Sequence, residues 1–202
     1  SQTEIARRIA ATGYIVLQPN VFYRVSRLPV FKFEMKRGEE RTVQRFRELA
    51  APLTAQAMEQ DGAAFVDYLE ALPGVSPGGV RVAGFCFTGS MALRTAAARP
   101  DRVVAAVSLH GGGLATEAPD SPHTVLPRVK ARLYFGHAIE DANMPREAIE
   151  RLERALQAWG GDYRSETYEG AYHSWTVGDS PVYNQLQADR AFHRLLECFA
   201  GA

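Results

Sequence analysis

The chain has 202 residues, 46% of them hydrophobic, and its 23 lysine and arginine side chains balance its 23 aspartate and glutamate side chains. This length and composition allow one sizeable core, so we expect a single domain over residues 1–202. The balanced charge gives no electrostatic reason to expect binding to nucleic acid or to an anionic membrane. No apolar run approaches the roughly 20 residues that a membrane-spanning helix needs.

The N-terminal part of the chain is expected to be mostly helical. Residues 2–11 have a helical pattern, and the apolar run at residues 14–17 predicts a strand. The polar, basic stretch at residues 24–41 predicts a loop. A long helical region follows, and we expect a break in it near Pro52 or Gly62.

The rest of the chain alternates between short apolar strands and helices. Strands are expected at residues 80–83, 103–109, 133–136 and 163–168. This alternation indicates an α/β fold with a mostly parallel sheet and helices on both faces. Such a sheet carries its chemistry at the carboxyl ends of its strands.

The two cysteines, Cys86 and Cys198, lie far apart in the sequence and do not indicate a disulfide framework. Cys198 is expected to be structural because it lies on the apolar face of the last predicted helix. Reduced thiols and the lack of a recognisable signal peptide make a cytoplasmic location the default expectation.

A predicted strand and a predicted helix are joined by residues 84–89, which read Gly-Phe-Cys-Phe-Thr-Gly. A strand, a tight glycine-flanked turn and a helix form the layout of a nucleophile elbow, here with cysteine in place of the more usual serine. The N-terminus of the helix favours negative charge and therefore the thiolate of Cys86, which is the form that attacks. The alternative is a buried core cysteine beside a glycine turn.

Two further side chains complete the order expected of a catalytic triad. Asp141 lies in the turn after the strand at residues 133–136, and His173 follows the strand at residues 163–168. Nucleophile, acid and base thus come in the chain order of an α/β-hydrolase, each after a strand. Taken singly, Asp141 also fits a turn residue and His173 a surface loop residue. Glu140 is the next candidate for the acid.

Five stretches of sequence, at residues 13–20, 84–87, 110–112, 136–145 and 168–175, together resemble the dienelactone hydrolase family of the α/β-hydrolase fold. The resemblance implies a Cys-His-Asp triad that hydrolyses a small carboxylic ester or lactone through an acyl-thioester. It makes Cys86 the nucleophile, His173 the base and Asp141 the acid that orients the base.

The resemblance also bears on substrate binding. Arg24 matches the position of an arginine that grips the substrate carboxylate in this family, but the position of a second such arginine is Val177 here. Thr88 stands where the family pattern has glycine. The backbone N–H of Phe87 is expected to donate to the developing oxyanion, and Trp175 is a candidate for lining the acyl pocket.

Family members carry several strands before the helix with which this chain opens. These include a His-Glu segment that supplies a second oxyanion-hole amide, and no such segment occurs in this sequence. The resemblance therefore predicts an N-terminally incomplete α/β-hydrolase domain. A His-Gly-Gly run at residues 110–112 is expected to mark a strand end beneath the active site.

No cofactor is expected, and His123 and His137 lack the spacing of a metal site. The expected partner is a small-molecule ester or lactone, and a homodimer is left open. The alternative function is a catalytically weak or inactive member of the fold that binds a small ligand or a protein partner.

Overall fold

The computed structural model describes residues 2–36 and 38–201, and these contain one sheet of four parallel strands. The strands cross the sheet in chain order: β1 (Val80–Phe85), β2 (Val103–Leu109), β3 (Arg132–Ala138) and β4 (Tyr163–Tyr168). Because all four run in the same direction, their carboxyl ends lie along one edge of the sheet. The expected parallel α/β architecture is confirmed.

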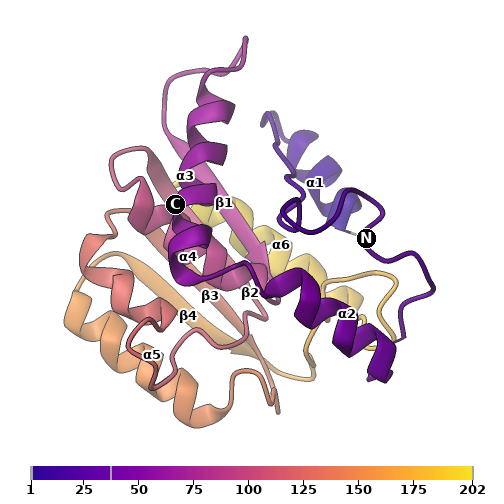
Figure 1. The fold of residues 1–202 in the computed structure, drawn as a ribbon. Helices are drawn as coiled ribbons and strands as arrows, with labels where there is room; N and C mark the ends of the chain where they lie inside the picture. The colour runs from indigo at the N-terminus through magenta and orange to yellow at the C-terminus, as the bar shows by residue number, and fades with distance from the viewer. Residues whose placement is uncertain (1, 37, 202) are drawn as a thin grey trace.

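Helices cover both faces of this sheet (Figure 1). One face packs against α3 (Ala55–Glu70), α4 (Thr88–Ala98), the short 3-10 helix η1 (Pro122–Arg128) and α5 (Arg146–Trp159). The other face packs against α6 (Gln185–Ala200) and α1 (Gln2–Ala10).

The alternating side chains of the central strand β2 join the two layers of helices. Ala106 packs in the core cluster on the α4 side, whereas Ala105, Val107 and Leu109 pack in the cluster that contains α6. This period of two is the pattern of a strand buried on both faces. The sheet is therefore buried between two layers of helices.

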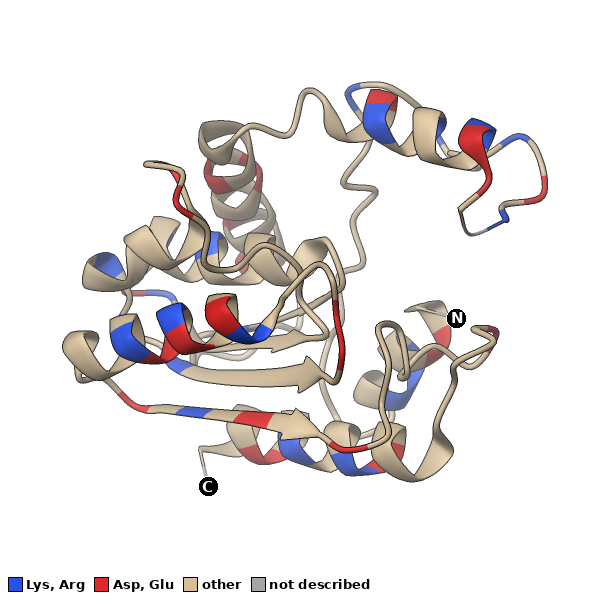
Figure 2. Ribbon diagram, turned by 90° about the horizontal axis from the view of Figure 1, so that it is seen from below, with Lys and Arg blue, Asp and Glu red and all other residues tan. Residues whose placement is uncertain are grey.

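Helix α2 (Glu40–Ala50) lies outside these layers (Figure 2), at the upper right of that view. Only Thr42 and Leu49 of this helix are buried. A break follows at the position expected from Pro52, and α3 begins after Thr54, whose side chain accepts a hydrogen bond of 3.1 Å from the N–H of Ala57. The other candidate for the break, Gly62, lies inside α3, where its lack of a side chain allows close packing against Thr95 of α4.

The strand predicted at residues 14–17 is wrong, because this segment pairs with no strand among the described residues. It lies instead along an apolar groove of about 680 Å³ that it lines together with β1 and α1. An extended apolar segment becomes a strand only where a neighbouring backbone supplies hydrogen-bond partners. The segment and β1 both line the groove, and they form no ladder with each other among the described residues.

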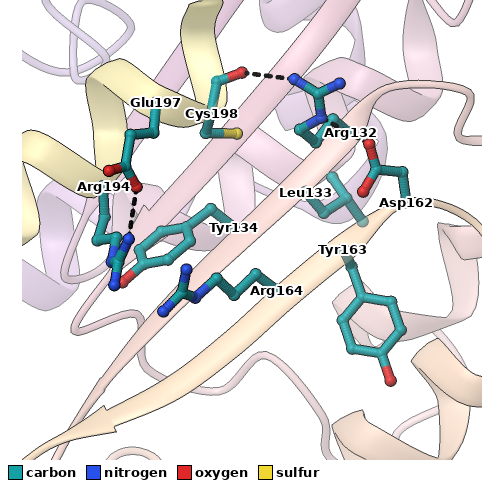
Figure 3. Close-up of a pocket in the computed structure, with 9 residues that line it drawn as sticks. All are labelled: Arg132, Leu133, Tyr134, Asp162, Tyr163, Arg164, Arg194, Glu197 and Cys198. Atoms are coloured by element: carbon teal, nitrogen blue, oxygen red, sulfur yellow. Dashed lines mark hydrogen bonds and ion pairs between the residues drawn. The ribbon is translucent and has the colours of Figure 1, made fainter. Parts of the chain in front are cut away.

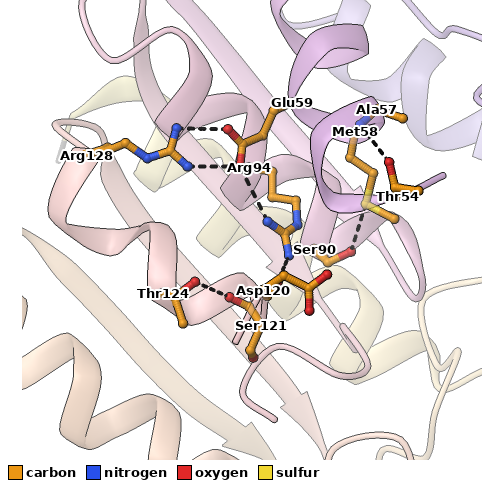
Figure 4. A network of polar contacts seen from close by, with 10 residues as sticks. All are labelled: Thr54, Ala57, Met58, Glu59, Ser90, Arg94, Asp120, Ser121, Thr124 and Arg128. Atoms are coloured by element: carbon orange, nitrogen blue, oxygen red, sulfur yellow. Dashed lines mark hydrogen bonds and ion pairs between the residues drawn. The ribbon is translucent and has the colours of Figure 1, made fainter. Parts of the chain in front are cut away.

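A charged network fixes the helix that starts at the predicted nucleophile (Figure 4). Glu59 of α3 accepts hydrogen bonds of 2.8 and 2.9 Å from Arg128 at the end of η1, and it lies 3.5 Å from Arg94 of α4. Arg94 is only 5% exposed and also donates to the backbone oxygen of Asp120. The network thus ties α4 to two segments far apart in the sequence, α3 and residues 120–128.

Candidate active site

Cys86 lies in the turn between β1 and α4, with a φ of 54°. This left-handed conformation is uncommon for a residue other than glycine, and it is typical of a nucleophile elbow. A side chain at Gly84 would come within 2.0 Å of the backbone oxygen of Thr88, and one at Gly89 within 2.3 Å of the Ser108 hydroxyl. Both flanking glycines are therefore needed for the turn.

Thr88, which departs from the family pattern, has a local role in the turn. Its hydroxyl accepts a hydrogen bond from the N–H of Phe85 and donates one to the oxygen of Phe85, both at 2.8 Å. The side chain therefore caps the end of β1 while α4 begins at Thr88 itself. The helix therefore starts inside residues 84–89, which were expected to form the connecting turn.

The structure brings Cys86, His173 and Asp141 together in one hydrogen-bonded line. His173 Nε2 lies 2.9 Å from Cys86 Sγ, and His173 Nδ1 lies 2.6 Å from Asp141 Oδ2. The loops after β3 and β4 are joined by a hydrogen bond of 2.9 Å from the N–H of Ile139 to the oxygen of Ala171. This bond helps to hold acid and base in register.

The Asp141 carboxylate is buried and fully oriented, with 6% of the residue exposed. Its second oxygen accepts hydrogen bonds from the backbone N–H of Asn143 at 2.9 Å and from the side-chain amide of Asn143 at 3.1 Å. Burial opposes the charged form, but the hydrogen bonds from His173 and Asn143 outweigh it and lower the pKa of Asp141. A charged Asp141 can therefore stabilise an imidazolium at His173.

The electrostatics of the other two groups favour charge separation. Burial of the Cys86 thiol opposes its ionisation, but the hydrogen bond and charge of His173, helped by the N–H of Phe87, lower the pKa of Cys86 below its ordinary value. Burial also opposes protonation of His173, yet the hydrogen bonds with Asp141 and Cys86 raise its pKa to about 9. Both shifts favour a thiolate at Cys86 paired with an imidazolium at His173.

His110 is a part of the site whose contacts the sequence does not reveal. The N–H of Cys86 donates to His110 Nδ1 at 3.1 Å, so the other ring nitrogen carries the proton and donates to Thr176 Oγ1 at 2.8 Å. Burial lowers the pKa of His110 to about 3, so the ring stays neutral beside His173, with ring centroids 5.4 Å apart. His110 thus shares the N–H of the predicted nucleophile with the oxygen of Leu109, which lies at 3.1 Å.

The glycines after His110 contact Asn143, which hydrogen-bonds the predicted acid Asp141. The N–H of Gly113 donates to the oxygen of Asn143 at 2.7 Å, and a side chain at Gly112 would come within 2.8 Å of the Asn143 side chain. The expectation that this run marks a strand end beneath the site agrees with its place after β2. The sequence indicated the position of residues 110–112 at the end of a strand, but it did not indicate their contacts with Asn143.

The two predicted substrate-binding residues, Trp175 and Arg24, already contact other side chains of the protein. Trp175 is completely buried, with its ring 5.0 Å from those of Tyr168 and His110, so it packs beneath the site. Arg24 is paired through both of its terminal nitrogens with the carboxylate of Asp61, one contact being 2.7 Å, and Asp61 is 4% exposed.

The second cysteine lies at the opposite edge of the sheet (Figure 3). Cys198 borders a pocket of about 240 Å³ that is also lined by Arg132 and Asp162, at the amino ends of β3 and β4. Burial raises the pKa of the Cys198 thiol to about 11. The positive charge of Arg132 opposes this rise but does not outweigh burial, so the Cys198 thiol is disfavoured as a thiolate.

Within residues 2–36 and 38–201, no group of three or more histidine, cysteine, aspartate or glutamate side chains is arranged to hold a metal ion. His137 stacks on Phe135 and contacts the hydroxyl of Ser165 at 3.1 Å, and His123 contacts Ser121. The helices of the described chain also include none that is long and apolar enough to cross a membrane.

The sequence profile of the dienelactone hydrolase family matches residues 1–202 of this chain. Among curated relatives, a "Putative carboxymethylenebutenolidase" of Synechocystis is 26% identical over 199 residues, which cover 97% of this chain and 78% of the relative. A "Carboxymethylenebutenolidase" of Rhodococcus opacus is 29% identical over 179 residues, which cover 86% of this chain and 64% of the relative.

Solved structures share the fold. A "Putative Dienelactone Hydrolase" from Klebsiella pneumoniae has a TM-score of 0.84 to this chain at 21% identity, covering 98% of this chain and 80% of the other. At that identity the likeness establishes the α/β-hydrolase fold alone, while the profile match over the whole chain establishes the family. The chain therefore belongs to the dienelactone hydrolase family, and its class of activity is the hydrolysis of carboxylic esters or lactones.

Proposed function

We propose that this protein hydrolyses a small carboxylic ester or lactone through an acyl-thioester on Cys86. The observation that supports the proposal most strongly is the continuous line of contacts from Asp141 to His173 to Cys86, with distances of 2.6 and 2.9 Å. The line lies at the carboxyl edge of a parallel sheet, where this architecture places its chemistry.

In the first half-reaction the thiolate of Cys86 attacks the carbonyl carbon, and a C–S bond forms as the carbonyl oxygen becomes an oxyanion. The backbone N–H of Phe87 follows the nucleophile directly and donates to that oxyanion. When the intermediate collapses, the C–O bond to the alcohol breaks. His173 gives its Nε2 proton to the departing alkoxide, which leaves a neutral imidazole and an acyl-thioester.

In the second half-reaction neutral His173 takes a proton from water, and the resulting hydroxide attacks the thioester carbonyl. The C–S bond breaks, the acid leaves, and Cys86 returns to the thiolate facing a protonated His173. The sum of both halves is ester plus water giving acid plus alcohol. The Asp141 carboxylate keeps the imidazole in one orientation throughout and stabilises its charged form.

The test is turnover of p-nitrophenyl acetate by the wild-type protein, by Cys86→Ala and by Cys198→Ala at equal concentration. The proposal predicts a rate in the wild type and in Cys198→Ala that Cys86→Ala loses by about 10⁴-fold. The Cys198 variant controls for loss of a thiol as such, and circular dichroism of all three controls for folding. Equal rates in the wild type and Cys86→Ala would reject the acyl-thioester mechanism.

A second candidate function is the binding of a small apolar ligand without catalysis, which is favoured by the groove of about 680 Å³ along β1. A fluorescent apolar probe such as 1-anilinonaphthalene-8-sulfonate separates the two. Saturable probe binding combined with no thiol-dependent turnover supports the binding function, whereas turnover that depends on Cys86 supports the hydrolase.

A further inference from the structure

Three phenylalanine rings meet beside the nucleophile, and we refer to Phe22, Phe46 and Phe87 as the aromatic cluster. The ring centroids of Phe46 and Phe87 are 5.5 Å apart, those of Phe22 and Phe46 are 6.0 Å apart, and those of Phe22 and Phe87 are 6.3 Å apart. The rings come from a loop, from α2 and from the elbow itself. Residues distant in the sequence therefore build one aromatic surface.

The surface is supported from below and open on one side. Phe22 and Phe87 pack on the buried side chains of Leu53, Met58 and Met91. Phe46, by contrast, is 37% exposed. Phe87 follows Cys86 directly in the chain, so we infer that an acyl group attached to the sulfur extends toward these rings. Flat apolar groups stack favourably on aromatic faces.

Arg24, two residues after Phe22, is already paired with a carboxylate. Arg24 forms its paired contact with the carboxylate of Asp61, which also accepts a hydrogen bond of 2.9 Å from the hydroxyl of Tyr23. The side chain of Asp61 is 5% exposed and that of Arg24 is 29% exposed. On the other side of the site, residues 174–178, which follow His173, contain no basic side chain.

We propose that the aromatic cluster and the Arg24–Asp61 pair make this enzyme selective for uncharged esters with an aromatic or similarly flat apolar acyl group, and not for substrates whose acyl part carries a carboxylate. The inference rests on the proposed thiol-dependent hydrolysis. It assigns Phe46 as a specificity-determining residue and Asp61 as the residue that withholds Arg24 from an anionic substrate.

The first experiment compares three esters with the same leaving group: p-nitrophenyl acetate, p-nitrophenyl phenylacetate and the p-nitrophenyl monoester of glutaric acid, which is anionic. Each kcat/KM is divided by the rate of the same ester with a free small thiol at the same pH, which removes intrinsic reactivity. We expect the phenylacetate to exceed the acetate by about tenfold, the scale of discrimination in an apolar pocket. The glutarate monoester is expected to fall below both.

Variants of the ion pair test the second half of the inference. Asp61→Asn frees Arg24 and should raise kcat/KM for the glutarate monoester relative to the acetate by about fivefold. In the double variant Asp61→Asn with Arg24→Gln this gain should disappear, which shows that the freed guanidinium causes it. Arg24→Gln alone should not raise the ratio of kcat/KM for the glutarate monoester to that for the acetate. Thermal melts identify any variant that fails to fold.

Phe46 tests the first half without disturbing a buried group, since it lies on the exposed helix α2. Phe46→Ala should lower the phenylacetate-to-acetate ratio of kcat/KM by about threefold or more. Val43→Ala is the matched control, because Val43 lies on the same helix and is also 37% exposed. It should leave the ratio unchanged.

Cys86-dependent turnover that favours the glutarate monoester, and that Arg24→Gln removes, would overturn the inference while leaving the proposed function intact. A phenylacetate-to-acetate ratio near one in the wild type would overturn it as well. Rates with all three esters that equal those of Cys86→Ala would reject the proposed hydrolysis itself, and the inference with it.

Discussion

The two thiols of this chain lie at opposite edges of one sheet, in opposite electrostatic surroundings. Cys86, at the carboxyl edge, contacts His173 at 2.9 Å, and its pKa is lowered. Cys198, beside the amino ends of β3 and β4, is buried without a histidine partner, and its pKa is raised to about 11. Reactivity thus follows from the neighbours that the fold supplies, because burial alone disfavours the thiolate at both positions.

The largest difference between the two edges of the sheet is expected when one aspartate is replaced at each edge, Asp141 near Cys86 and Asp162 near Cys198. Asp141→Asn should lower kcat/KM by about 10⁴-fold, because the amide no longer holds His173 in the productive tautomer or stabilises its charge. Asp162→Asn, which loses an exposed pair of 2.6 Å with Arg132 beside Cys198, should leave kcat/KM unchanged. The measurement is steady-state hydrolysis of p-nitrophenyl acetate. Full activity in Asp141→Asn would point to Glu140 as the acid.

Alkylation by iodoacetamide tests the two thiols directly. At pH 7 Cys86 should react about 100-fold or more faster than Cys198, since a thiol of raised pKa has almost no thiolate there. Peptide mass spectrometry after timed quenching measures both rates in one sample.

The pH dependence of the Cys86 alkylation rate tests the cause of this reactivity. The rate should rise with pH around a midpoint below the ordinary thiol value of about 8.5, because a lowered pKa moves ionisation to lower pH. A His173→Ala variant should move that midpoint upward, and an unmoved midpoint would contradict the ion pair.

The elbow can be strained at a single glycine. Gly84→Ala should reduce the free energy of unfolding by about 3 kcal/mol, because the new methyl group meets the backbone oxygen of Thr88 and the turn cannot relax easily. Gly178→Ala is the control, since nothing lies within 4 Å of the position of its added carbon. Urea titrations of both variants measure the difference. An unchanged stability in Gly84→Ala would mean that the turn is looser than described.

The smallest effect is expected at His110. His110→Phe removes one of the two acceptors for the N–H of Cys86, the oxygen of Leu109 being the other, and should cost at most about tenfold in kcat/KM, the scale of one buried hydrogen bond. The acid limb of the pH–rate profile should stay in place, because His110 remains neutral down to a pKa of about 3. A shift of that limb would instead place the titration of His110 in the mechanism.

Much of this arrangement could be predicted from the sequence. The strands follow from short apolar runs, and the order of Cys86, Asp141 and His173 after three of them predicts a shared edge, because parallel strands align their carboxyl ends. The failures concern long-range pairing. Residues 14–17 look like a strand, but they pair with no strand in the described part of the chain.

The side-chain contacts around the site could not be predicted from the sequence either. The pairing of Arg24 with Asp61 joins positions 37 residues apart, and the contact of His110 with Thr176 joins positions 66 apart. Residue types do not fix such contacts, because they depend on how helices and loops pack. Trp175 shows the same limit, since its place two residues after His173 gave no sign that its side chain is buried in the core.

The most direct test of the central claim is to trap the acyl-enzyme. The protein is mixed with p-nitrophenyl acetate, quenched in acid within the first turnovers, digested and examined by mass spectrometry. The mechanism predicts an acetyl group on the peptide that contains Cys86 and none on the peptide that contains Cys198. If a His173→Gln variant is still acylated, its acetylated peptide should accumulate, because the base that activates water is missing. An acetyl group on another residue, or equal labelling of both cysteines, would contradict the assignment of Cys86 as the nucleophile.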